Sequence, residues 1–252
     1  MPRPQTTSAP VIGDGHALAA EAIEAHGGAS WGSTNEVVLR VSAGGFAFAS
    51  KLQGHAVRDV EARVATSSQR VVFEPYPSPG QRGVLEADGS VRIERGGETL
   101  DSRPNPRAAF AGLRHSLWWD RLDILYFGTC ALWTYVSTPF VFTREDYALR
   151  ELEPWEEAGE RWRRLAVSFP AGVHTHCAEQ VFYIDGGGLI RRHDYTAEPF
   201  GERARAAHYS FEHRPFGGLL LATRRAVFPR RRDNRPRRHP RLVWIELSEP
   251  AA

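Results

Sequence analysis

The chain has 252 residues, a formal net charge of +2 and two cysteines. A length of about 250 residues fits one large all-β domain as well as two smaller domains, and no linker divides this chain. The small net charge provides no global field to attract nucleic acid or a membrane surface. Two cysteines are too few for a disulfide framework. The sequence therefore predicts free thiols, no nucleic-acid partner and a single domain over residues 14–249.

The N-terminal segment MPRPQTTSAP lacks the apolar run of roughly 7 to 15 residues that a secretory signal peptide needs. With Met1 as the start, the sequence predicts a cytoplasmic protein whose residues 1–13 form a disordered tail. Asp14 is a suitable cap for a helix that ends near His26, where the glycine pair starting at Gly27 provides the left-handed stop that helix ends favour.

Most of the remaining chain alternates between apolar and polar residues in short segments. Such segments, separated by Gly, Asp, Ser or Pro, run from Val37 to Glu94 and resume after the middle of the chain, from ALRELEP to LVWIEL. This spacing is typical of an antiparallel sheet or barrel. Hairpin turns are predicted at Asp88-Gly89, at residues 186–188 and at Gly217-Gly218. The predicted fold class is α+β, mostly β.

Residues 124–143, ILYFGTCALWTYVSTPFVFT, carry no charge. A stretch this apolar must be covered by a membrane, a protein core or a bound apolar molecule. Pro139 lacks a backbone donor, and a membrane-spanning segment must satisfy every backbone polar group internally. The sequence thus predicts a helix and a turn packed inside the fold, as part of a helical insertion over residues 105–143, with no stable membrane insertion.

Two segments resemble a known family. AIEAHGGASW at residues 22–31 and YSFEHRPFGGLLLATRRAVF at residues 209–228 look like the first helix and a C-terminal hairpin of LolA-like proteins, the outer-membrane lipoprotein-sorting type. WWDRLDILYFG and FYIDGGGLIRRHDYTAE look like a bacterial branch of cytosolic relatives. The resemblance implies a strongly bent antiparallel sheet, a half-barrel, with an N-terminal helix and a central apolar helix covering its concave face over a cavity for acyl chains.

A half-barrel leaves three roles open for the uncharged stretch. It is a central core helix, or its aromatic residues line a ligand pocket, or it forms a membrane-inserted hairpin. Ligand pockets are mostly apolar, with a few placed polar groups. In the pocket interpretation, the candidate ligand-binding residues are Trp118, Trp119, Tyr126, Phe127, Trp133, Tyr135 and Tyr195.

Two predicted strands flank the PFGER loop and should form a hairpin. In the expected register, Asp194 lies opposite His208 and His193 lies opposite Tyr209. An Asp oriented against a His fixes the imidazole tautomer and raises its basicity, as a general base requires. His208, Asp194 and His193 are therefore the catalytic candidates. A structural cross-strand pair is the alternative, and a slip of one residue would separate the pair.

Other polar groups point to no cofactor and no metal. His174, His176 and Cys177 offer metal-ligand atom types, but no second cluster at zinc-site spacing completes four ligands, so an exposed loop cluster is expected. No nucleophile elbow, phosphate loop or dinucleotide fingerprint occurs. The segment 229–241 holds seven arginines and is predicted to be a long solvated loop, with a partner or an anionic head group as the alternative.

Three functional hypotheses follow. The first is a binding protein or carrier that encloses an apolar or amphipathic small molecule in the half-barrel. The second is a cofactor-independent enzyme, such as a cyclase, isomerase or hydrolase of a hydrophobic metabolite, that uses the His/Asp pair for proton transfer. The third is a protein whose sheet or arginine loop engages a macromolecular partner. We favour the first.

Overall fold

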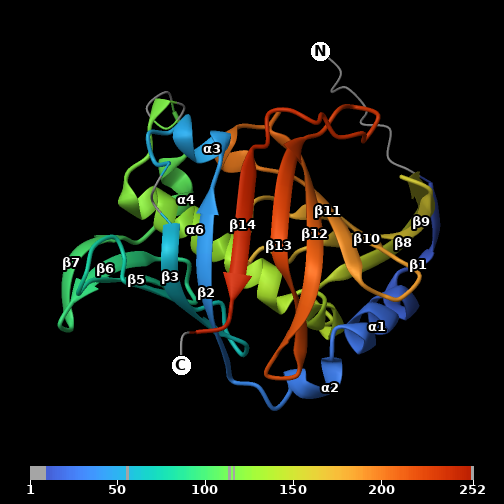
Figure 1. The fold of residues 1–252 in the computed structure, drawn as a ribbon, viewed down its shortest axis with the longest axis horizontal. Coiled ribbons are helices and arrows are strands. Elements are labelled where there is room, and N and C mark those ends of the chain that lie inside the picture. Colours follow the sequence, from blue (N-terminus) through green and yellow to red (C-terminus); the bar gives the residue numbers. More distant parts are fainter. Residues whose placement is uncertain (1–9, 55–56, 113–114, 116, 251–252) are drawn as a thin grey trace.

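The computed structural model describes residues 10–54, 57–112, 115 and 117–250. In this part of the chain, fourteen strands form one antiparallel sheet in the order β1-β8-β9-β10-β11-β12-β13-β14-β2-β3-β4-β5-β6-β7. The sheet is open and strongly bent, and Figure 1 shows α6 running across one of its faces behind β13 and β14. We call the face that α6 covers the concave face and the opposite one the convex face. The α+β, mostly-β prediction is confirmed.

The described elements alternate between long strands and short helices. The helices are α1 His16–Ala25, α2 Gly28–Trp31, α3 Phe46–Ala49, α4 Pro106–Ala109 and α6 Arg121–Ser137, with the 3-10 turns η1 Phe140–Thr143 and η2 Glu198–Phe200. The strands are β1 Val11–Asp14, β2 Glu36–Gly44, β3 Val57–Ala65, β4 Val71–Glu74, β5 Arg82–Leu85, β6 Val91–Arg95, β7 Glu98–Arg103, β8 Ala148–Glu157, β9 Glu160–Ser168, β10 Glu179–Ile184, β11 Ile190–Thr196, β12 Arg205–Phe216, β13 Leu219–Pro229 and β14 Val243–Ser248.

All three predicted hairpin turns join antiparallel neighbours. The turn at Asp88-Gly89 is longer than the two residues expected, because the Glu86 amide donates to the Ser90 carbonyl at 2.9 Å and leaves three residues in the loop. Gly89 has φ +83° there, and an added Cβ would lie 2.1 Å from the His174 ring. Only glycine fits this position, since it combines a left-handed backbone with a close neighbour.

The N-terminal region differs in part from the prediction. Residues 11–13, expected in a disordered tail, belong to β1, which pairs with β8 at the edge of the sheet. Residues 1–9, the rest of that predicted tail, lie outside the described residues. The N-cap of α1 is Gly15 rather than the predicted Asp14, although Asp14 Oδ1 accepts a hydrogen bond from the amide of His16, the first residue of α1, at 3.0 Å. Helix α1 then packs against β8, β9 and η1.

Helix α6 begins with a capping box. The Asp120 side chain accepts from the Asp123 amide, and the Asp123 side chain accepts from the Asp120 amide. Arg103 from β7 donates to both carboxylates, so charge-assisted hydrogen bonds fix the position of the helix start. These hydrogen bonds connect the start of α6 to β7, the edge strand at the end of the sheet opposite β1.

The threonine hydroxyls of α6 and of its C-terminal cap are satisfied by the helix backbone. The hydroxyls of Thr129, Thr134 and Thr138 each donate to the carbonyl four residues earlier, at 2.5, 3.0 and 2.7 Å. This local bonding lets threonine lie in an apolar environment without an unpaired hydroxyl. Almost the whole helix is buried, as the core interpretation of the uncharged stretch predicts. Among the described helices, none is long and apolar enough to cross a membrane.

Candidate ligand-binding site

Small residues on α6 leave an apolar cavity between the helix and the concave face. Gly128 and Ala131 are three positions apart and so share one side of the helix, facing β2, β13 and β14. The cavity has a volume of about 40 Å³, which exceeds the roughly 10 to 15 Å³ that one water needs. Its lining residues are Val41, Ala43, Phe48, Val57, Phe73, Phe127, Gly128, Ala131, Leu132, Tyr135, Tyr195, Val227, Val243 and Ile245.

The Gly128 position is open enough for a side chain. A Cβ added there would lie 3.5 Å from the Phe73 ring, an ordinary van der Waals distance. We expect Gly128→Ala to raise the free energy of unfolding by about 1 kcal/mol, because glycine within a helix is less favourable than alanine by that amount. Urea unfolding of both proteins measures the change. A loss of stability would show that the space beside Phe73 does not exist.

Three of the seven predicted ligand-binding residues meet at this cavity. Phe127 and Tyr135 reach it from α6, and Tyr195 reaches it from β11. They provide aromatic surface with two phenol hydroxyls, one from the helix and one from the sheet. Burial raises the pKa of Tyr135 to about 12, so its hydroxyl is neutral and able to donate at physiological pH.

The other four predicted residues lie elsewhere. The Trp133 indole donates to the carbonyls of Ala65 and Ser68 at 3.3 and 3.1 Å. Tyr126 is buried, with its hydroxyl 3.4 Å from His174 Nδ1. Trp119 is fully buried, and its indole donates to the His115 carbonyl at 2.9 Å. Trp118 is 40% exposed. These tryptophans and Tyr126 do not line the cavity.

The predicted pairing of Asp194 with His208 is wrong. His193 lies opposite His208, and Asp194 lies opposite Ala207. The reason is the connecting turn: Ala197 donates to Ala204 at 2.8 Å, whereas the expected register placed Glu198 there. Since neighbouring residues of a strand face opposite sides of a sheet, Asp194 points to the convex face, and both histidines point to the concave face.

Asp194 belongs to a buried ionic cluster on the convex face. Its carboxylate accepts two hydrogen bonds from Arg192, at 2.7 and 2.8 Å, and one from the Tyr183 hydroxyl at 2.8 Å. The Arg192 guanidinium also donates to Glu157 at 2.7 Å and lies 4.6 Å from the centroid of the Tyr183 ring. This bidentate geometry is the strong form of an arginine–carboxylate pair. The cluster thus connects β11 to β8 and β10 on the convex side of the sheet.

The arginine-rich loop contributes to that cluster. Arg230 Nε lies 3.5 Å from Asp194, and the Asn234 carbonyl accepts a hydrogen bond from Arg192. Residues 230 and 236 form an isolated β-bridge. The prediction of a wholly solvated loop is therefore wrong at its first residues, which pack on the sheet because they complete the coordination of a buried carboxylate and guanidinium.

The concave face holds buried histidines beside the cavity. The His208 ring lies 4.8 Å from the Tyr135 ring in an edge-to-face arrangement. His193 Nε2 bonds to Gln180. His176, expected in an exposed loop cluster, is buried with its ring stacked on Phe127 at 4.2 Å. Burial lowers the pKa of His176 to about 3 and holds the pKa of His193 and of His208 well below the usual value.

These histidines do not form a metal centre. Within the described residues, no group of three or more His, Cys, Asp or Glu is arranged to hold a metal ion. Cys130 and Cys177 are both buried free thiols. The concave site is therefore an apolar cavity with neutral imidazole and phenol groups at one side.

Sequence reasoning missed the groups that shape the site, although signals for them exist. The cavity results from two small residues, Gly128 and Ala131. The prediction from sequence selected large aromatic residues instead. The pair Arg224-Arg225 lies within a strand, so one of the two must face the concave side. Arg225 does so, as a buried arginine opposite Ser210 of β12.

Comparisons with known proteins agree with this arrangement of a bent sheet around a buried helix. No protein-family model and no curated protein matches the sequence. Among solved structures, the fold is similar to a LolA superfamily protein from Nitrosomonas europaea, with a TM-score of 0.51, 8% identity, and coverage of 95% of this chain and 94% of that chain. A DUF1329 family protein from Desulfovibrio piger gives a TM-score of 0.50 and 14% identity, over 96% and 92% of the two chains.

Identities this low show the fold alone. The class is therefore one of fold: a bent antiparallel sheet that encloses a helix. More specifically, the chain has a LolA-like fold, and the fold implied by the sequence resemblance is confirmed.

Proposed function

We propose that this protein binds the apolar chain of a lipid-like small molecule between α6 and the concave face, and acts as a carrier or binding protein. The observation that carries the proposal is the cavity beside Gly128 and Ala131. A glycine within a buried helix costs stability, and here it leaves empty apolar space rather than allowing a close backbone contact.

The cavity must enlarge to accept a ligand. Its volume of about 40 Å³ is far below the roughly 300 to 1,000 Å³ of a typical small-molecule site. The wall opposite the sheet is a single helix, α6. Binding in this proposal therefore includes a shift of α6 away from β2 and β14, with the ligand replacing their contacts.

A solved structure of similar fold supports the shape of the proposed site. The protein from Nitrosomonas europaea is described as a LolA superfamily protein, and that group gives the fold its name. The likeness supports the shape of the site, and the ligand class rests on the apolar lining of this chain's own cavity.

The catalytic alternative needed Asp194 to orient His208. The two residues lie on opposite faces of the sheet, so the proton-transfer pair does not form. In the described part of the chain, neither ring nitrogen of His208 has a hydrogen-bond partner. With no carboxylate to raise its basicity, His208 lacks the orienting group that a general base requires, and we do not propose an enzyme.

Filling the cavity tests the proposed function. Ala131→Leu places three more carbon atoms in the cavity, so we expect it to weaken binding of the apolar fluorescent probe N-phenyl-1-naphthylamine by about tenfold, equivalent to about 1.4 kcal/mol. Ala226→Leu, on the convex face of β13, is the matched control and should leave binding unchanged. Equal affinity of the Ala131 variant and the wild type would place the probe elsewhere and refute the site.

A further inference from the structure

A buried arginine lies at one side of the site. Arg225 of β13 is 7% exposed, and its guanidinium lies 4.6 Å from the centroid of the Tyr135 ring. Nη1 donates to Ser210 Oγ at 3.2 Å and Nη2 donates to the Tyr135 carbonyl at 3.4 Å. Among the described residues, Arg225 Nε has no hydrogen-bond partner and no carboxylate lies within ion-pair distance of this side chain.

The contrast with Arg192 shows how unusual this environment is. Arg192 is also buried, but Asp194 and Glu157 neutralise its charge. Arg225 has only neutral partners, and burial lowers its pKa to about 10, which still leaves it protonated at neutral pH. A buried charge without a counter-charge is costly. The charge of Arg192, on the convex face, is thus compensated by carboxylates. The charge of Arg225, on the concave face of the same sheet, is not.

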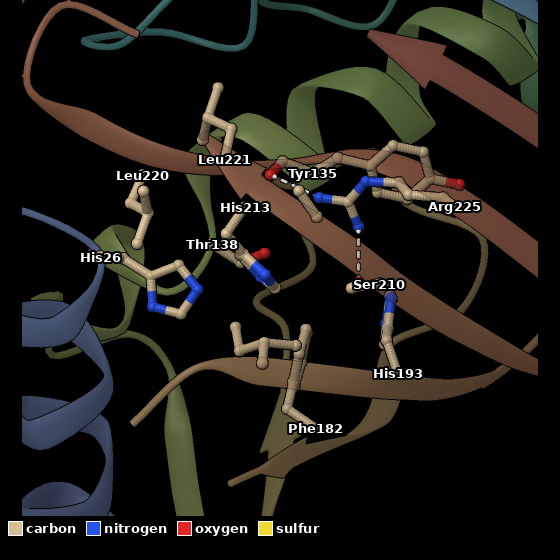
Figure 2. A pocket seen from close by; sticks show the side chains of 12 residues that line it. His26, Tyr135, Thr138, Phe182, His193, Ser210, His213, Leu220, Leu221 and Arg225 are labelled. Atoms are coloured by element: carbon tan, nitrogen blue, oxygen red, sulfur yellow. Dashed lines mark hydrogen bonds between the residues drawn. The ribbon is translucent and has the colours of Figure 1, made fainter. Parts of the chain in front are cut away.

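A small cavity lies against Arg225. Its volume is about 10 Å³, close to the space of one water-sized group. Figure 2 shows Arg225 between Tyr135 and Ser210, with His193 beside Ser210. The lining residues are His26, Tyr135, Thr138, Phe182, Ile190, His193, Ser210, His213, Leu220, Leu221, Ala222 and Arg225. Tyr135 also lines the apolar cavity, so one side chain forms a wall common to both spaces.

We propose that Arg225 binds the carboxylate of an apolar carboxylic acid, such as a long-chain fatty acid, whose chain occupies the cavity beside α6. This inference rests on the proposed function and names its ligand class. The free Nε–H and the guanidinium charge supply a charge-assisted hydrogen bond, and the carboxylate supplies the counter-charge that Arg225 lacks. A movement of Tyr135 joins the two spaces.

The surroundings favour a singly charged, compact head group. Arg225 provides one positive charge, and His193 and His208 are neutral because burial and the arginine itself lower their pKa values. A phosphate head group carries more negative charge than one guanidinium compensates, and it is bulkier than a carboxylate. Ser210 and the buried histidine nitrogens are neutral donors or acceptors that suit a carboxylate.

Comparing oleate with oleyl alcohol tests the inference, because the two ligands share a chain and differ in the head group. Isothermal titration of the wild type should show oleate binding about tenfold tighter or more, since a hydrogen bond to a charged group is worth at least one order of magnitude in affinity. Arg225→Met should remove this preference while leaving the affinity for oleyl alcohol unchanged. Arg224→Met, on the convex face of the same strand, is the matched control.

The outcomes separate the two proposals. Equal affinity of the wild type for acid and alcohol, or an Arg225→Met variant that keeps its preference for oleate, would overturn the carboxylate site while leaving the apolar site intact. Failure of both ligands to bind would overturn the proposed function itself. If Arg225→Met does not fold, Arg225→Lys keeps the positive charge and should retain the preference for oleate. The comparison of oleate with oleyl alcohol on the wild type still tests the carboxylate site.

Discussion

Replacing Asp194 by alanine is expected to lower the free energy of unfolding by about 3 to 5 kcal/mol, because it breaks a buried bidentate ion pair and leaves the Arg192 guanidinium with Glu157 alone as a carboxylate partner among the described residues. Arg192 would lose its bidentate acceptor in an environment where its side chain is fully buried. Tyr183 would also lose the acceptor of its hydroxyl. Urea unfolding followed by circular dichroism measures the loss.

Asp146→Ala is the control for this prediction. Asp146 also forms a two-point contact with an arginine, Arg144, at 3.0 and 2.7 Å, but that pair is exposed. Exposed ion pairs contribute little to stability, so this variant should unfold close to the wild type. Similar losses in both variants would show that burial of Asp194 has no special effect.

Mild acid is expected to destabilise the protein at a pH above the range in which carboxylates titrate. His176, His193 and His208 have folded-state pKa values below their usual value of 6.5 because burial disfavours the charged form. Their contribution to stability is complete above pH 6.5 and is lost as the pH falls toward the folded-state values. Each histidine then costs about 1.4 kcal/mol per pH unit, and the three together about 4 kcal/mol.

The stability of the protein, typically about 5 to 15 kcal/mol for a domain, should therefore fall as the pH drops below 6.5. Urea midpoints at pH 7, 6 and 5 test this, and His208→Leu should make the fall with pH smaller, since one of the buried histidines is gone. Equal midpoints at pH 7 and pH 5 would mean that the histidines gain protons freely in the folded state, contrary to their burial.

Local patterns in the sequence predicted the elements of the fold well. Alternating segments became strands, and the glycine turns became hairpins, because both depend on interactions within a few residues. The neighbours of β14 were beyond such reasoning: β14 pairs with β13 and also with β2, some two hundred residues earlier in the chain. Nothing in the local pattern of LVWIEL identifies β2 as its partner.

The register between β11 and β12 shows why the polar site was mispredicted. The turn η2 takes up Glu198, with the Phe200 amide donating to the Ala197 carbonyl at 2.8 Å. One residue of difference in the turn moves Asp194 from the face of His208 to the opposite face. A register that depends on turn geometry cannot be read from residue types alone.

The apolar site was predictable from the sequence only in part. Residue type identified the aromatic walls, including Phe127 and Tyr135, but a cavity depends on where side chains are small and neighbours fail to fill the space. Gly128 gives that space only because Phe73 lies 3.5 Å from the position of its missing Cβ. That distance is a property of the packed structure, not of the sequence around residue 128.

The most direct test of the account uses nuclear Overhauser effects between unlabelled oleate and protein with carbon-13 methyl groups. The account predicts contacts from the oleate chain to the methyls of Ala131, Val227 and Ile245, which line the cavity between α6 and the sheet. Contacts confined to convex-face methyls such as that of Ala226, or no contacts at saturating oleate, would contradict binding inside the half-barrel.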